Sequence, residues 1–105
     1  MGQLFIGVNR TFCFESDLKT RNLAAAVCDK TKPNQVWTWS RSTKLLNNTK
    51  TGNYLLADLR GNQMVSLSFA SQCSGFWPPM AAGNAFQYKN CDPEDDLQVF
   101  TFGNV

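Results

Sequence analysis

The chain has 105 residues and a formal net charge of +2, with 17% charged and 43% apolar residues. This length allows one domain with one core, and no apolar run approaches the roughly 20 residues of a membrane-spanning helix. Lysine and arginine are scattered singly among the acids, which argues against a nucleic-acid binder. We therefore expect one domain over residues 1–105, without a nucleic-acid partner or an inserted membrane segment.

Short apolar runs bounded by Asn, Gly, Asp and Pro dominate the chain, whereas helix signals are weak. Such runs are typical of strands, and turn residues separate several of them. In chain order we expect strands at Gln3–Val8, Thr11–Glu15, Leu23–Val27, Val36–Ser40, Lys44–Asn47, Tyr54–Leu59, Val65–Ser71, Ala85–Tyr88 and Gln98–Phe102. Short strands at this spacing predict an all-β sandwich or barrel.

One segment of the chain occurs twice. The residues from Cys28 to Trp39 recur 63 positions later, from Cys91 to Phe102, with Cys, Asp, Gln, Val and Thr at identical spacing. Duplicated segments are typical of folds built from repeated units. In each copy a glutamine precedes two aromatic residues two positions apart, which lie on one face of an extended strand. We therefore predict these side chains to be part of the structural core: Gln35, Trp37, Trp39, Gln98, Phe100 and Phe102.

The chain contains no histidine and four cysteines, which are Cys13, Cys28, Cys73 and Cys91. The gaps of 15, 45 and 18 residues between them lack the two close pairs of a four-cysteine zinc site. An even number of cysteines in a small domain points to disulfides and an oxidising compartment, and two glycosylation sequons, at Asn9 and Asn47, agree with it. We expect a secreted or extracellular ectodomain, without a signal peptide of its own; a cytosolic chain with free thiols is the alternative.

The sequence offers little for catalysis. Without histidine the usual general base near neutral pH is missing, and the cysteines are better explained as bonded than as nucleophiles. The acidic cluster at 92–96 is expected to be a solvated turn, because calcium needs about six or more converging oxygens and Pro93 stiffens the loop. We therefore expect no enzymatic activity, no cofactor and no metal ion.

The stretch from Cys13 to Trp39 runs through a polar turn, an apolar strand, Cys-Asp, a five-residue turn and Gln-Val-Trp. It resembles one lobe of the ricin-type β-trefoil, whose recurring motif is Gln-x-Trp. The resemblance implies a β-trefoil-like fold in which Gln35 bridges backbone groups of its lobe and Trp37 packs in a shared core. A complete trefoil has three similar lobes, and this chain is short for them. We therefore expect one lobe to be cut short; a related barrel or sandwich is the alternative.

The same resemblance implies a disulfide pattern, because the cysteines of one lobe pair with each other. Cys13 is then bonded to Cys28, which leaves Cys73 for Cys91. A disulfide that closes a loop of this size stabilises a fold by about 3 kcal/mol in the chain-entropy model.

A closer resemblance is to the cysteine-rich N-terminal domain of the mannose-receptor family. It is carried by Gln3–Ile6, Val27–Asp29, Trp37–Trp39 and two turns, Gly61–Gln63 and Ser74–Trp77. In that family the two turns form a pocket for sulfated N-acetylgalactosamine. The resemblance therefore implies ligand-binding roles for the following residues: Trp77, Asn62, Ser74, Gln63, which replaces the family's arginine, and Arg60, which lies nearby.

Trp77 is the best candidate for the platform on which a sugar ring stacks. It follows the flexible Ser74-Gly75 turn and precedes two prolines that would stiffen and display it; the alternative is that Trp77 fills the core. Glu15 and Asp58 stand where ricin-type lobes have a sugar-binding acid, so they are weaker candidates or solvated charges.

These features predict a non-catalytic, lectin-like module that binds a glycan or glycoprotein carrying terminal or sulfated sugars. The alternative is a protein-interaction or spacer domain that has lost sugar binding. Its signature would be an exposed apolar patch over residues 76–80 that is large enough to dock a protein partner.

Overall fold

The computed structural model describes residues 2–67 and 72–103, and in this part of the chain there are ten strands and two short 3-10 helices. The strands are β1 (Gly2–Ile6), β2 (Phe12–Ser16), β3 (Leu23–Val27), β4 (Val36–Ser40), β5 (Leu45–Asn48), β6 (Tyr54–Arg60), β7 (Gln63–Ser66), β8 (Gln72–Gly75), β9 (Gln87–Asn90) and β10 (Phe100–Gly103). The helices are η1 (Pro33–Gln35) and η2 (Asp96–Gln98). The predicted all-β class is confirmed, and the named strands pair antiparallel.

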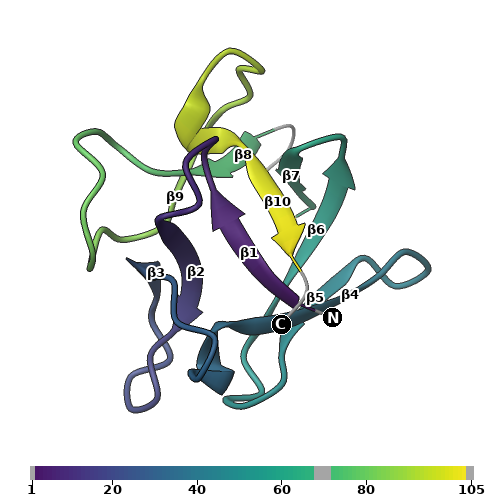
Figure 1. Cartoon of the computed structure of the whole chain (residues 1–105). Coiled ribbons are helices and arrows are strands. Elements are labelled where there is room, and N and C mark those ends of the chain that lie inside the picture. The colour runs from purple at the N-terminus through teal and green to yellow at the C-terminus, as the bar shows by residue number, and fades with distance from the viewer. Residues whose placement is uncertain (1, 68–71, 104–105) are drawn as a thin grey trace.

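The sheet follows the chain from neighbour to neighbour, in the order β3-β2-β1-β4-β5-β6-β7-β8-β9. The last strand, β10, leaves this path and pairs with β1, with Leu4 opposite Phe102 and Ile6 opposite Phe100. Figure 1 shows β10, in yellow, beside β1, in purple, near the middle of the molecule. The two ends of the described chain therefore lie side by side and share one stretch of sheet.

Two similar units make up most of the fold: β1–β4 with η1, and β7–β10 with η2. In the first unit Phe5 on β1 pairs with Cys13 on β2, and in the second Val65 on β7 pairs with Cys73 on β8. The second and third strands of each unit form an antiparallel pair, β2 with β3 and β8 with β9. A 3-10 helix and the fourth strand, β4 or β10, come after this pair. Between the units the described chain has only two strands, β5 and β6, where each unit has four. The sequence repeat is thus the second half of a longer structural repeat.

Each unit carries one disulfide that ties its hairpin to the turn that follows. Cys13 is bonded to Cys28 with a Cα–Cα distance of 5.0 Å, and Cys73 to Cys91 with 4.9 Å. These are the pairs that the resemblance to a trefoil lobe implied, and both distances are usual for disulfides.

The core is built around the ring of Phe14, on β2. This ring stacks on Trp37 with 5.0 Å between centroids, and it meets Phe76 at 6.4 Å and Phe100 at 6.0 Å edge to face. Trp37 and Phe100 are the first aromatic residues of the two repeats, so both repeats face the same interior. The buried apolar cluster consists of Leu4, Ile6, Phe14, Ala25, Trp37, Leu46, Leu55, Ala57, Met64, Phe76 and Phe100.

The second aromatic residue of each repeat behaves differently. Trp39 packs against the core cluster, and its Nε1 donates a hydrogen bond to the carbonyl oxygen of Ala57 at 2.9 Å. Phe102 is 38% exposed, so the prediction that it belongs to the core is wrong. Phe102 lies on β10, which in the described part of the chain has a neighbouring strand, β1, on one side only. Trp39 lies on β4, which has β1 on one side and β5 on the other.

Two predicted strands, Leu23–Val27 and Val36–Ser40, have the predicted limits. The prediction missed β8, because Gln-Cys-Ser-Gly has no alternation of apolar residues; its pairing with β9 and the disulfide specify it instead. The strand expected at Val65–Ser71 corresponds to β7, which ends at Ser66, and residues 68–71 lie outside the described part of the chain. Gln98 ends η2 and is not the start of a strand.

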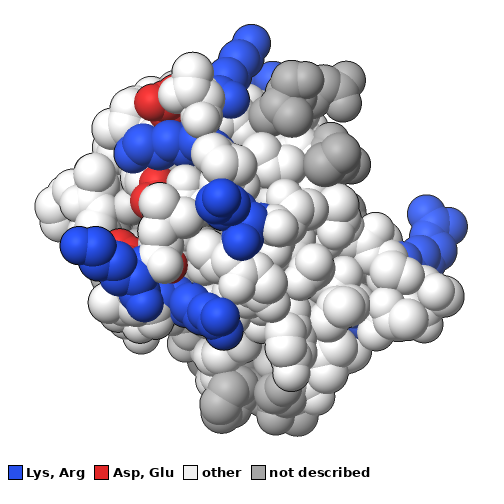
Figure 2. Space-filling model, turned by 90° about the horizontal axis from the view of Figure 1, so that it is seen from below, with Lys and Arg blue, Asp and Glu red and all other residues white. Residues whose placement is uncertain are grey.

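Basic side chains do not form a continuous stripe on the face shown in Figure 2. They lie mainly on one side of this face, with acidic side chains between some of them, and much of the rest carries no charge. No helix in the described residues is long and apolar enough to cross a membrane.

Candidate functional site

A buried glutamine organises the turn after each hairpin. In the first unit the Oε1 atom of Gln35 accepts hydrogen bonds from the backbone N–H of Asp29 and from Nε2 of Gln3, both at 2.9 Å. Its Nε2 atom donates to the carbonyl oxygen of Val27 and to the Glu15 carboxylate, again at 2.9 Å. The amide thus holds together both strands of the hairpin, the turn and β1.

The second unit repeats this network around Gln98. Oε1 of Gln98 accepts from the backbone N–H of Asp92 at 2.9 Å and from Nε2 of Gln63 at 3.3 Å. Nε2 donates to the carbonyl oxygen of Asn90 at 2.9 Å and to the Asp95 carboxylate at 3.2 Å. Gln63, a predicted ligand-binding residue, therefore has the same place in this network as Gln3 has in the first.

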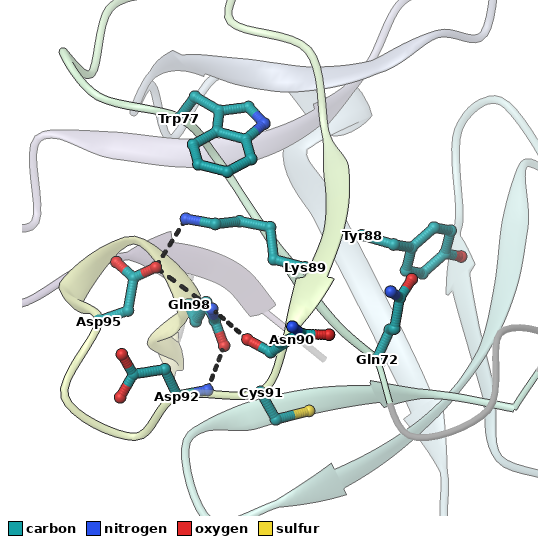
Figure 3. A pocket seen from close by; sticks show the side chains of 9 residues that line it. All are labelled: Gln72, Trp77, Tyr88, Lys89, Asn90, Cys91, Asp92, Asp95 and Gln98. Atoms are coloured by element: carbon teal, nitrogen blue, oxygen red, sulfur yellow. Dashed lines mark hydrogen bonds and ion pairs between the residues drawn. The ribbon is translucent and has the colours of Figure 1, made fainter.

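The exposed indole of Trp77 lies next to the hydrogen-bond network of Gln98. The preceding residue, Phe76, is buried in the core, whereas Trp77 is 62% exposed. Trp77 lines a depression of about 610 Å³, and Figure 3 shows the residues around it. The depression is lined by Gln72, Trp77, Tyr88, Lys89, Asn90, Cys91, Asp92, Asp95 and Gln98. Trp77 also lines a second, smaller depression of about 390 Å³ with Pro78, Pro79, Ala81, Asn84, Ala85 and Gln87.

Lys89 holds the indole and the turn of the second unit together. Its Nζ atom lies 4.3 Å from the ring centroid of Trp77 and 2.7 Å from Oδ2 of Asp95. Figure 3 shows Lys89 between the two side chains. It also donates to the carbonyl oxygen of Phe76 at 3.3 Å. A cation over an indole face is attracted by the negative potential of the ring. One face of Trp77 is therefore already occupied by the protein's own ammonium group.

The carboxyl group of Asp95 is stabilised in its charged form. The hydrogen bond from Lys89 is the main cause that lowers the pKa of Asp95, and the backbone N–H of Leu97, which donates to Oδ1 at 3.0 Å, lowers this pKa further. The second bond caps η2. Asp95 is thus ionised at neutral pH, and its charge is matched by Lys89 at close range.

Of the five predicted ligand-binding residues only Trp77 lines either depression. Ser74 is fully buried, so the prediction that it contacts a ligand is wrong, and its Oγ has no hydrogen-bond partner in the described residues. Ser74 lies on β8, between β7 and β9, and its Oγ atom is buried. Asn62 and Arg60 lie at the exposed turn from β6 to β7, where Arg60 Nε bonds Asp58 Oδ2 at 2.8 Å.

The two acids with weaker predicted roles are also engaged. Glu15 accepts the hydrogen bond from Gln35, and it lines a separate depression with Asp17 and Lys32. Asp58 lies between Arg60 and Lys44, whose hydrogen bonds, Arg60's first, lower the pKa of this carboxyl group.

Sequence reasoning missed Lys89, Asp92 and Asp95 as neighbours of Trp77. The repeat could have placed Asp92, since it corresponds to Asp29, but Lys89 and Asp95 correspond to an alanine and a lysine in the first unit. Only the pairing of β9 with β8 brings Lys89 next to the chain that leads to Trp77.

The apolar patch expected over residues 76–80 is smaller than predicted. Phe76 is buried against Phe14 and Phe100, and Met80 packs against the core cluster. Trp77, Pro78 and Pro79 remain exposed.

The two glycosylation sequons lie in different settings. Asn9 is exposed in the turn after β1, whereas Asn47 is half-buried within β5, between partners on β4 and β6.

No group of three or more acidic, cysteine or histidine side chains in the described residues is placed to hold a metal ion. No protein-family model matches this chain, and neither does any curated protein or solved structure.

Proposed function

We propose that the chain is a non-catalytic carbohydrate-binding module with a β-trefoil-like, ricin B-type fold and one truncated lobe. Two four-strand units with the same glutamine network support two of the lobes, and the two strands between them support a shortened third. Two disulfides fit the oxidising compartment of a secreted or receptor ectodomain.

The exposed indole of Trp77 is the observation that carries the proposal. A tryptophan usually contributes most when its large apolar surface is buried, yet this one is exposed next to a core that holds four other aromatic rings. The C–H face of a sugar ring can cover such an indole. Because three contacts hold Lys89 on one face of Trp77, we expect the sugar to stack on the other face.

Polar groups around the indole offer partners for sugar hydroxyls. The amides of Gln72 and Asn90 and the carboxylate of Asp92 line the larger depression, and Gln87 lines the smaller one. Planar amides and carboxylates can each exchange two hydrogen bonds with a pair of neighbouring hydroxyls. Trp77 lines both depressions, and the smaller one, which Gln87 also lines, is the one whose lining does not include Lys89.

A protein-interaction or spacer domain is the second candidate. Two of the residues that the resemblance implies for sugar binding have other roles in the fold, which favours this candidate. Ser74 is buried, and the Gln63 amide donates a hydrogen bond to Gln98. The exposed apolar surface at Trp77, Pro78 and Pro79 is small for a protein interface. We therefore rank it second; stable complexes in pull-down experiments, without any glycan bound, would reverse the order.

Substitution of Trp77 tests the proposal. On a glycan array, and then in titrations at millimolar sugar, we expect Trp77→Ala to weaken binding about tenfold or more, which corresponds to about 1.4 kcal/mol. Tyr54→Ala is the matched control, because Tyr54 is 60% exposed and lines neither depression. Both variants should keep the thermal unfolding midpoint of the wild type. Undiminished binding by Trp77→Ala, or no sugar bound by the wild type, would contradict the proposal.

A further inference from the structure

The charges around Trp77 restrict which sugars this site can hold. Among the described residues that line the two depressions, Lys89 is the only cation, while Asp92 and Asp95 are acids. The smaller depression has no charged residue in its lining. A negatively charged sugar therefore has one candidate partner of opposite charge.

That partner is already engaged. The ammonium group of Lys89 has three donors, and it contacts the Asp95 carboxylate, the carbonyl oxygen of Phe76 and the face of Trp77. Its side chain is only 11% exposed. To bind a sulfate, Lys89 would have to leave the ionised Asp95 partly buried without its counter-ion, and breaking such a pair is costly.

The remaining local charge is negative. Once Lys89 and Asp95 neutralise each other, Asp92 is left in the lining, and the exposed Glu94 and Asp96 lie in the same turn. In the described part of the chain none of these three acids forms an ion pair. Of these three acids only Asp92 lines the larger depression, and at short range its field repels an anionic ligand.

No arginine supplies a cation in the described lining of either depression. Arg60 bonds Asp58 at the β6–β7 turn and lines neither depression. Strong sulfate sites use cationic donors that form charge-assisted hydrogen bonds, and no such free donor lies in the described lining.

We infer that the Trp77 site takes an uncharged sugar and rejects sulfated or carboxylated ones, an inference that rests on the proposed carbohydrate-binding function. The uncharged lining of the smaller depression, with the amide of Gln87, suits the hydroxyl groups of an uncharged ring on the free face of Trp77. Asp92, in the lining of the larger depression beside Trp77, repels ligand anions.

Matched pairs of glycans test the inference on the intact chain. Each pair differs by a single sulfate or carboxyl group, and the affinities are measured at about 150 mM salt and again at lower ionic strength. We expect the uncharged member to bind about tenfold or more tightly than the charged one, and the difference to widen at low salt because screening is weaker. Equal or tighter binding of the charged member overturns the inference and leaves the proposed function intact. Binding of neither member overturns the proposed function itself.

A charge substitution separates the role of Asp92 from the net charge of the protein. In Asp92→Asn the ratio of the two affinities should fall about threefold, since one nearby negative charge is removed. The control is Asp58→Asn, which changes the net charge equally at a residue that lines neither depression, and the ratio should be unchanged. If both variants behave alike, the assignment to Asp92 is overturned.

Discussion

At the scale of single residues, two glutamines specify the turns of this protein. A glutamine amide has two donors and one oxygen with two acceptor positions, and Gln35 and Gln98 each use both ends in almost the same way. Both side chains are buried. The two glutamines have the same place in their units. This explains why the glutamine recurs at identical spacing from the cysteine, while most residues between the two differ.

Removal of either amide should therefore destabilise the fold. We expect Gln35→Ala and Gln98→Ala each to lower the free energy of unfolding by about 1–3 kcal/mol, because buried backbone groups of the turn lose their partner. Gln87→Ala serves as the control, since Gln87 is exposed. Urea denaturation measures all three, and a loss for Gln87→Ala as large as for the other two would contradict the assignment.

The pair of Lys89 and Asp95 gives the fold a dependence on acid. Hydrogen bonding from Lys89 is the first cause that lowers the pKa of Asp95 in the folded state. A carboxyl group with a lowered pKa stabilises the fold above its ordinary unfolded pKa of about 4. This stabilisation is lost as the pH falls through the pKa of the folded state.

Denaturation across the acid range tests this coupling. Between about pH 5 and pH 2 we expect the wild type to lose stability more steeply than Asp95→Asn, which cannot titrate at this position. Trp77 reports the same event, because its fluorescence should change when the carboxylate that holds Lys89 against the indole is protonated. Parallel acid curves for the two proteins would show that Asp95 is not responsible.

At the scale of elements, the hairpin with its disulfide is the repeated part. Each disulfide joins the second strand of its unit to the first residue after the third strand, with separations of 15 and 18 residues. The middle segment, β5 with β6, has no disulfide. In the sheet it lies between β4 and β7, the neighbouring strands of the two units. Disulfides thus occur where a hairpin lies towards an end of the sheet path.

The two disulfides should make similar contributions to stability. Because the closed loops are of similar size, the chain-entropy model assigns about 3 kcal/mol to each. We expect the double variants Cys13→Ala/Cys28→Ala and Cys73→Ala/Cys91→Ala to lose nearly equal free energies of unfolding in urea titrations. A difference above about 2 kcal/mol would mean that one unit depends on its disulfide for more than loop closure.

At the scale of the whole molecule, the two units share one core. Phe14 contacts Trp37 of its own unit and both Phe76 and Phe100 of the other, and β1 pairs with both β4 and β10. The first strand therefore joins the two units, which could not bury their aromatic residues separately.

The sequence by itself determined the all-β class, the repeat and the burial of Gln35, Trp37, Gln98 and Phe100, since strand patterns and a duplicated motif are local properties of the chain. Only the tertiary structure decided that Phe102 is exposed, that Ser74 is buried and that Lys89 covers one face of Trp77. These outcomes depend on which strand lies next to which, as β10 lies beside β1 and β9 beside β8. Such neighbours are far apart along the chain or joined by a long turn, so no local pattern specifies their contacts.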